Sequence, residues 1–502
     1  MSRGLFASLY EAGRPFALID TRERRDHVDG HWFGSTNIPL SVLTAGITRL
    51  VPDRDFPVHL LDWQDAASNA AAQRLSQLGY ASVTNCPTSH PGGFGEGFVK
   101  GEYVWSKAFG EVLAHRCGLP EVTPSEYLQH HRDALLFDVR PTAEYRQFTI
   151  PGSQSLPNSL LLANMEALKA SGRTALLHCA GRTRSIIGAC TLKAAGYDGP
   201  FAIFKGGTQA WQLDGHDREH QAGRVFAGDT DSPVATRAFL DKWRIPFDRV
   251  EAGDIGPFVE AHRGRLLFDV SDDAARGRPM EHGILRLSGT NLIQQTDQAV
   301  ARYHVPVVLF DHGSGSRAAF AAYWLRAMGF SVQVALLDGR LDEAPAPDTG
   351  QIETPFPVLA ADELTAHRNH SGPVLDFRSS AAFRAASLTG SSWLNISACL
   401  SGSPSPEPAV IIANDIPHGV ETANVLAAHG WRVAGIFPWS SATSLDPAGV
   451  APGDPGIAID ESALFAGRHH GNMQDSRDYL AWEEELPGQI DDPILQQWHR
   501  LL

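Results

Sequence analysis

The sequence predicts an α/β protein made of four tandem domains, each with a parallel sheet flanked by helices, followed by a C-terminal helical arm. Three observations lead to this class. Short apolar runs alternate with helical stretches of roughly ten to fifteen residues, which is typical of βαβ units. A strand-end pattern occurs four times, and a second landmark follows each occurrence. Ligands of such sheets bind beyond the carboxyl ends of the strands, so we expect the functional residues there.

The first landmark is an apolar strand that ends in an aspartate and a polar turn. The apolar residues 16–19 lead into the first of these aspartates, and the pattern then returns three times. The four aspartates are Asp20, Asp138, Asp269 and Asp376. They lie more than a hundred residues apart, which is the length of a whole domain rather than of a solenoid repeat. We therefore expect four homologous domains.

The second landmark is a glycine followed by an aromatic residue near the end of each repeat. These pairs are Gly79-Tyr80, Gly196-Tyr197, Gly329-Phe330 and Gly430-Trp431. At a fixed distance before the glycines stand Asp62, Cys179, His312 and Ala413, so only the second repeat has a cysteine there. The predicted domains are 1–116, 117–228, 229–345 and 346–450, and 451–502 form the arm.

The loop that contains Cys179 is the strongest candidate site. It follows the apolar run 175–177 and precedes a helical stretch that begins at Ile186. A cysteine that a strand delivers into a tight turn before a helix faces backbone N–H groups and the positive end of the helix dipole. Arg182 and Arg184 add positive charge. Both effects favour the thiolate, which is the nucleophilic form of cysteine.

Composition argues against several classes of function. The net charge of -15 argues against nucleic acid or an anionic membrane as partner, because both require a basic patch. The five cysteines have no CxxC spacing, which argues against a disulfide framework and against structural zinc. We expect no cofactor. No apolar signal-peptide core precedes Glu11 and Arg14, and no run approaches the roughly 18 apolar residues of a membrane helix. We therefore expect a cytoplasmic protein.

Several motifs resemble those of the rhodanese family of sulfurtransferases, and the resemblance covers nearly all of the chain to about residue 450. The motifs are Asp138-Val139-Arg140, Glu144-Tyr145, Ile150-Pro151-Gly152-Ser153, Pro157, the Cys179 loop ending in Arg184-Ser185, and Lys205-Gly206-Gly207-Thr208-Gln209-Ala210-Trp211. The resemblance implies that Cys179 takes the outer sulfur of thiosulfate or a similar donor as a persulfide and passes it to a thiol or cyanide. The loop residues expected to hold this small anionic donor are Ala180, Gly181, Arg182, Thr183, Arg184 and Ser185.

The resemblance also implies roles for the repeats that lack the cysteine. Two-domain members of the family commonly have a cysteine-free first domain, often with aspartate at the cysteine position, packed against an active second domain. Repeats one and two are similar to this arrangement, with Asp62 inert and Cys179 active. Repeats three and four would then form a second pair without a cysteine at the active position.

The cysteine loop departs from the family pattern in one place. Counting the cysteine as the first position, Gly181 stands third and Arg182 fills the fourth position, where the family commonly has glycine. The loop from Cys179 to Arg184 is one residue shorter than the loops of related families that act on phosphate or arsenate. Two alternatives stay open: a cysteine-dependent phosphatase or arsenate reductase, and a multidomain sulfur-carrier scaffold that docks a protein partner.

Overall fold

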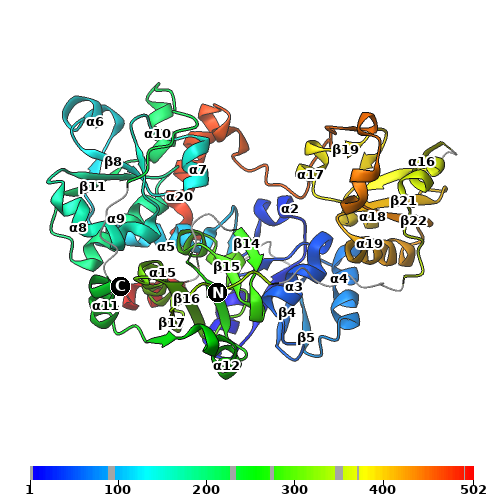
Figure 1. The fold of residues 1–502 in the computed structure, drawn as a ribbon, viewed down its shortest axis with the longest axis horizontal. Helices are drawn as coiled ribbons and strands as arrows, with labels where there is room; N and C mark the ends of the chain where they lie inside the picture. Colours follow the sequence, from blue (N-terminus) through cyan, green and yellow to red (C-terminus); the bar gives the residue numbers. More distant parts are fainter. Residues whose placement is uncertain are drawn as a thin grey trace.

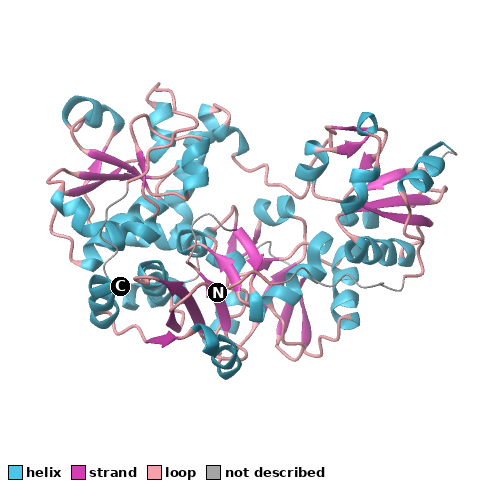
Figure 2. Cartoon of the chain, in the orientation of Figure 1, coloured by secondary structure: helices cyan, strands magenta, loops and turns pink. Residues whose placement is uncertain are grey.

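The computed structural model describes residues 4–88, 97–226, 233–271, 276–344, 354–369, 372–490 and 492–501. Within these ranges the strands form four sheets of four to six strands and two small two-stranded sheets. We call the parts of the chain around the four larger sheets the first to fourth units. Figure 2 shows the strands of these sheets flanked by helices, which confirms the predicted α/β class. The predicted boundaries after residues 228 and 345 lie outside the described residues.

The first two units contain the amino-terminal half of the chain. The first comprises α1 (Leu5–Glu11), β1 (Ala17–Asp20), α2 (Arg24–Asp29), β2 (His31–Trp32), β3 (Thr36–Asn37), η1 (Leu40–Val42), α3 (Leu43–Leu50), β4 (Val58–Asp62), α4 (Ala66–Gln77), β5 (Val83–Pro87) and β6 (Phe98–Val99). Helix α5 (Val104–Cys117) connects it to the second unit. The second comprises β7 (Glu121–Val122), α6 (Pro124–His130), β8 (Leu135–Asp138), α7 (Thr142–Gln147), β9 (Gln154–Ser155), η2 (Asn158–Leu160), α8 (Leu161–Ala170), β10 (Ala175–His178), α9 (Thr183–Ala195), β11 (Phe201–Phe204) and α10 (Gly207–Leu213).

The third and fourth units follow, and then the C-terminal helices. The third comprises α11 (Pro233–Lys242), β12 (Phe247–Val250), η3 (Ala252–Asp254), α12 (Ile255–Ala261), β13 (Leu266–Asp269), β14 (Arg276–Pro279), η4 (Glu281–Gly283), β15 (Leu285–Leu287), α13 (Gly289–Gln294), α14 (Thr296–Ala299), β16 (Val307–His312), α15 (Ser316–Ala327) and β17 (Val332–Leu337). The fourth comprises α16 (Ala361–Asn369), β18 (Val374–Asp376), α17 (Ser380–Ala385), β19 (Ser387–Leu388), β20 (Ser392–Trp393), α18 (Ile396–Ser401), β21 (Ala409–Ala413), α19 (Ile416–Ala428), β22 (Val433–Pro438), η5 (Trp439–Ser444), η6 (Pro447–Gly449) and β23 (Val450–Ala451). Beyond them lie η7 (Ala466–His469), α20 (Met473–Glu485), η8 (Leu486–Gln489) and α21 (Asp492–Leu501).

One order of parallel strands recurs in all four larger sheets. In each sheet the strand that ends in the aspartate lies between a short strand and the strand that precedes the cysteine position, and a last strand lies beyond the latter. We call the short strand the return strand. The four orders are β3-β1-β4-β5, β9-β8-β10-β11, β15-β13-β16-β17 and β20-β18-β21-β22. The predicted strand ends at the four aspartates are confirmed. Parallel strands end at the same edge of a sheet, so the cysteine position lies beside the aspartate turn in each unit.

Buried ion pairs hold these aspartate turns. In three of the units an arginine two residues after the aspartate donates to its carboxylate, and the partner oxygen lies 2.7 Å, 2.7 Å and 2.6 Å away in the pairs Arg22–Asp20, Arg140–Asp138 and Arg378–Asp376. Burial disfavours the charge on Asp138, but Arg140 outweighs it and lowers the pKa of Asp138 to about 2. The third unit has a serine at the arginine position, and Arg286 from the return strand takes over at 2.7 Å from Asp269.

The units pack on one another through several helices, and the first unit also packs on the third, where Tyr303 donates to the carbonyl of Gly34 at 2.9 Å. In the second and third units, α15 packs on η2 and α8, and Trp324 donates to Thr191 Oγ1 at 2.9 Å. In the first and fourth units, α18 packs on α4 and η1, and Ser397 donates to Glu23 at 2.8 Å. The expectation that the first unit pairs with the second and the third with the fourth stays a prediction, and α5, most of which the predicted first domain contains, packs on α9 of the second unit. Spacing along the chain carries no information about which helical faces meet.

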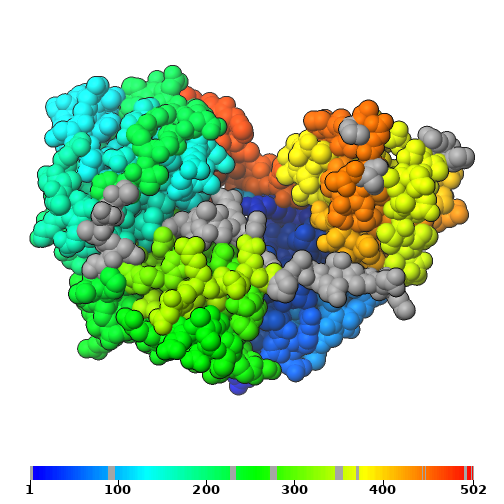
Figure 3. All heavy atoms as spheres, viewed as in Figure 1, coloured from blue at the N-terminus to red at the C-terminus, as the bar shows by residue number. Residues whose placement is uncertain are grey.

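Elements outside the sheets fill the centre of the molecule. Helix α5 packs on α9, and both α20 and α21 pack on α5 (Figure 1). Trp498 of α21 is fully buried and contacts the rings of Trp105 and Phe109 of α5. In Figure 3 the fourth unit forms a lobe that a notch separates from the second unit, while Asp460 and Glu461 of the C-terminal segment bond to α17 of the fourth unit. The C-terminal helices therefore return to the middle of the fold, next to the cysteine loop.

None of the described helices has the length and apolar character needed to cross a membrane.

Candidate active site

Cys179 lies immediately after β10 and before the first turn of α9, as the sequence predicts. Its side chain is buried, with 2% of the residue exposed, and Sγ lies 3.8 Å from Ser185 Oγ. Ser185 in turn donates to the carbonyl of Arg182 at 2.7 Å, which closes the loop on itself. The loop therefore presents a thiol at the amino-terminal end of a thirteen-residue helix, where positive backbone charge favours an anion.

Helix α10 supports the loop from behind. The N–H groups of Thr208 and Gln209 donate to the carbonyls of Cys179 and Ala180, both at 3.0 Å. Gly207 has a left-handed φ of +54°, and a Cβ atom there would collide with the carbonyl of Cys179. Gly207, the first residue of α10, is therefore required because the backbone approaches the cysteine loop so closely.

Arg184 is held by Glu144 of α7. Its Nη1 atom lies 2.8 Å and 2.9 Å from the two carboxylate oxygens. Burial disfavours the charge on Glu144, but the guanidinium groups of Arg184 and Arg140 outweigh it and lower the pKa of Glu144. The pair fixes the Arg184 side chain beside the cysteine loop, because charge-assisted hydrogen bonds of this kind are short and directional.

Arg182 pairs with carboxylates from outside the second unit. Its Nε and Nη2 atoms donate to the two oxygens of Glu111 on α5 at 2.9 Å and 3.0 Å. Its Nη1 atom lies 2.8 Å from Glu484 on α20. Arg182, at the fourth loop position, therefore links the loop to α5 and α20, two helices outside the second unit.

Glu483 of α20 lies directly against the loop. It accepts hydrogen bonds from the Arg182 N–H and the Thr183 hydroxyl, both at 3.2 Å, and from Lys107 Nζ at 2.8 Å. A Cβ atom at Gly181 would collide with Glu483 and with Tyr479. The glycine at the third loop position is therefore explained by the close approach of α20.

His178 is buried beneath the loop and held neutral. Its Nε2 atom lies 2.8 Å from Ser153 Oγ, and its Nδ1 atom lies 3.3 Å from the carbonyl of Cys179. Burial, only partly opposed by Asp138, lowers the pKa of His178 to about 4. The neutral imidazole of His178 bonds to these two groups and so fixes the end of β10.

The buried, neutral state of His178 predicts that the second unit loses stability in mild acid. Between about pH 4 and the ordinary imidazole pKa of 6.5, the unfolded chain binds a proton on His178 that the folded chain does not. Stability therefore rises with pH across this window and falls by roughly 3 kcal/mol as the pH drops from 6.5 to 4. Thermal unfolding scans across the window, compared between the wild type and His178→Gln, measure the effect. Equal acid sensitivity in both proteins would contradict it.

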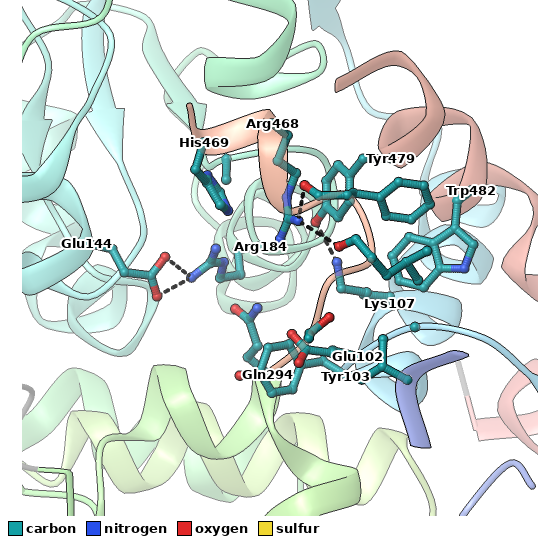
Figure 4. Close-up of a pocket in the computed structure, with 16 residues that line it drawn as sticks. Glu102, Tyr103, Lys107, Glu144, Arg184, Gln294, Arg468, His469, Tyr479 and Trp482 are labelled. Atoms are coloured by element: carbon teal, nitrogen blue, oxygen red, sulfur yellow. Dashed lines mark hydrogen bonds and ion pairs between the residues drawn. The ribbon is translucent and has the colours of Figure 1, made fainter. Parts of the chain in front are cut away.

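A pocket of about 230 Å³ opens beside the loop at Ala180 and Arg184. Figure 4 shows Arg184 between Glu144 on one side and Lys107 and Arg468 on the other. Further lining residues come from α5 and its N-terminal flank, from α13 of the third unit, and from the C-terminal segment: Glu102, Tyr103, Gln294, Phe465, His469, Tyr479 and Trp482. The pocket is therefore completed by parts of the chain outside the second unit.

Of the predicted site residues, Ala180 and Arg184 line this pocket, whereas Arg182 and Thr183 bond to carboxylates of α5 and α20. The structure also adds residues that the motifs did not indicate. The added residues are Lys107, Glu111, Tyr479, Glu483 and Arg468. Lys107 and Glu111, like Tyr479 and Glu483, stand four residues apart on one helical face, which is the one signal in the sequence that links them. Within the part of the chain that the structure describes, no group of three or more His, Cys, Asp or Glu side chains is placed to hold a metal.

Comparison with known proteins gives a match across almost the whole chain. The family model described as the rhodanese-like domain matches residues 123–214. A crystal structure of thiosulfate sulfurtransferase from Pseudomonas aeruginosa is 28% identical, with a TM-score of 0.81 over 96% of either chain. A possible tyrosine phosphatase from Rhodopseudomonas palustris is 24% identical over 22% of this chain and 91% of that chain, with a TM-score of 0.20.

A rhodanese-related protein from Thermoplasma volcanium is 21% identical over 20% of this chain and 97% of that chain, with a TM-score of 0.18. No curated protein sequence matches the chain. The matched residues include β10, the Cys179 loop and α9, with the strand order and the loop position described above. Residues 123–214, with Cys179 at the end of their central strand, therefore form a rhodanese-like domain.

Proposed function

We propose that this protein is a sulfurtransferase of the rhodanese type and that Cys179 carries the sulfur. The observation that carries the proposal is the position of Cys179, at a strand end before α9 within a matched rhodanese-like domain. The likeness to a thiosulfate sulfurtransferase over 96% of either chain supports it. Thiosulfate or a persulfide is the proposed donor, and a thiol or cyanide is the proposed acceptor.

The proposed reaction has two half-reactions. The Cys179 thiolate attacks the outer sulfur of thiosulfate, the S–S bond breaks, and its electron pair leaves with sulfite, so that Cys179 becomes a persulfide. An acceptor thiolate or cyanide then attacks the outer persulfide sulfur, and the Cys179 thiolate is released. The loop from Ala180 to Ser185 forms the wall of the site, and Arg184, held by Glu144, supplies positive charge.

The same proposal assigns roles to the four units. We regard each as a rhodanese-like domain, because the strand order recurs in all of them. The positions equivalent to Cys179 hold Asp62, His312 and Ala413, so the second unit alone carries the sulfur. The others complete the fold around it, as α13 of the third unit does at the pocket. The proposed partners are a small anionic donor and a thiol or protein acceptor.

Steady-state kinetics with thiosulfate and cyanide test this function. Because the sulfur rests on the enzyme between two half-reactions, initial rates measured against both substrates should give the parallel double-reciprocal lines of a ping-pong mechanism. Intersecting lines would contradict a free persulfide enzyme. Hydrolysis of an aryl phosphate that disappears in Cys179→Ser would instead favour a phosphatase.

A further inference from the structure

The four units differ in how the first turn of the helix after the cysteine position is capped. In three of them a nearby aspartate accepts from backbone N–H groups of that turn. The pairs are Asp65 with Ser68 at 2.7 Å, Asp311 with Arg317 and Ala318 at 3.1 Å, and Asp415 with His418 at 2.9 Å. In the second unit the carboxylate comes instead from Glu483, far along the chain on α20. The Arg182 N–H and the Thr183 hydroxyl are therefore already bonded within the protein.

The cations nearest the loop are also largely neutralised by carboxylates. Lys107 bonds to Glu483, Arg182 pairs with Glu111 and Glu484, and Arg184 uses one nitrogen on Glu144. Besides Arg184, whose Nη1 alone pairs with Glu144, an anionic substrate group that enters the pocket can be recognised by a cation without a carboxylate partner.

Arg468 is that cation. Its Nη1 atom donates to the carbonyls of Leu464 at 3.4 Å and Phe465 at 2.7 Å, and its guanidinium lies 4.6 Å from the ring centroid of Tyr479. Within the described ranges it forms no ion pair with a carboxylate. Figure 4 shows it lining the pocket on the side opposite Glu144. The backbone and ring contacts fix the guanidinium while leaving its other nitrogens to a ligand.

The imidazole next to Arg468 carries no charge, and two bulky residues near it have unusual backbone angles. Burial and the guanidinium groups of Arg468, Arg140 and Arg218 lower the pKa of the neighbouring His469 to about 3, so this imidazole is neutral. Phe465 and Tyr103, which also line the pocket, both have left-handed φ angles, of 55° and 58°. Such a backbone is costly for bulky residues and is concentrated at ligand sites. The pocket is thus lined by three cations, Lys107, Arg184 and Arg468, by the carboxylates Glu102 and Glu144, and by this strained backbone.

We propose that Arg468, which lies outside the rhodanese-like domain, binds the anionic group of the sulfur donor and determines specificity for anionic donors. The substrate class is a small sulfane-sulfur compound with an anionic group on its leaving portion, such as thiosulfate. In thiosulfate this portion is already anionic before the reaction, and a fixed guanidinium binds it through charge-assisted hydrogen bonds, which an uncharged alkyl group cannot accept. This inference rests on the proposed sulfur transfer for its role in the reaction, but it makes a separate claim about anion binding.

Calorimetric titration of thiosulfate into full-length protein with the Cys179→Ala substitution tests the anion-binding claim without any reaction. Adding Arg468→Gln should weaken binding at least about tenfold, because a charge-assisted contact is lost, and Arg468→Lys should restore part of it. Arg477→Gln, an exposed arginine on α20, is the matched control and should change the affinity less than about twofold. Unchanged affinity in the Arg468→Gln protein would overturn the proposal.

Single-turnover transfer to Cys179 tests specificity in the otherwise wild-type protein. Arg468→Gln should lower the second-order rate constant for thiosulfate at least about tenfold, and that for an alkyl persulfide with an uncharged alkyl group less than about threefold. An equal loss with both donors would indicate a merely structural role and would overturn the proposal. If the wild type accepted no sulfur while thiosulfate binding still depended on Arg468, the proposed function would fail and the anion site would stand.

Discussion

Replacing Cys179 with alanine is expected to lower sulfur transfer from thiosulfate to cyanide by at least about a thousandfold. The reason is that the sulfur must bond covalently to this side chain, and an alanine offers no nucleophile. The residue lies at the strand end, against the first turn of α9, and no other cysteine has this setting among the described residues. Steady-state rates at saturating thiosulfate measure the loss.

Cys86→Ala is the matched control for that substitution. Cys86 lies in β5 of the first unit, with Sγ 3.6 Å from His59 Nδ1, and it takes no part in the cysteine loop. Its removal should leave the rate within about twofold of the wild type. Full activity in Cys179→Ala, or equal losses in the two variants, would place the nucleophile elsewhere.

The second large effect is expected at Glu483. Glu483 and Lys107 are 1% and 5% exposed, and they pair at 2.8 Å between α20 and α5. Glu483→Leu would leave the ammonium group buried without its partner, which costs about 3–5 kcal/mol. Burial already lowers the pKa of Lys107. Hydrogen exchange of the α20 amides should therefore accelerate by more than about a hundredfold, because that helix loses its main polar contact with the core.

The double variant Lys107→Met/Glu483→Leu separates stability from the geometry of the loop. Replacing both members of a buried pair with apolar side chains of similar size removes the uncompensated charge, so protection of α20 should largely return. The Arg182 N–H and the Thr183 hydroxyl still lack their acceptor in this protein, so turnover should stay below that of the wild type. Exchange as fast in the double variant as in Glu483→Leu would show that the pair does not fasten the helix.

The sequence was informative where the pattern is local. An apolar strand ending in aspartate, and a cysteine before a helical run, are signals that a short window contains, and they located Cys179 and its loop. The fold class followed from the same alternation of strands and helices. The recurring strand order extends this regularity to all four larger sheets.

The rest of the site depends on tertiary packing and could not be predicted in this way. Lys107 and Glu483 belong to helices far apart in the chain, and charged residues four apart are equally typical of an exposed helical face. Only the docking of α20 makes Gly181 necessary. Likewise, the arginine at position 182 is explained by its ion pair with Glu111 on α5. Gly181 and Arg182, where the loop departs from the expected pattern, therefore both contact elements outside the second unit, as Thr183 also does.

Intact-mass measurement of the full-length protein after incubation with thiosulfate tests the central claim most directly. The wild type should gain the mass of one sulfur atom, the added sulfur should map to the peptide that contains Cys179, and cyanide should remove it. Cys179→Ala should gain nothing. No added sulfur in the wild type, or the same gain in Cys179→Ala, would contradict the proposal that this residue carries sulfur as a persulfide.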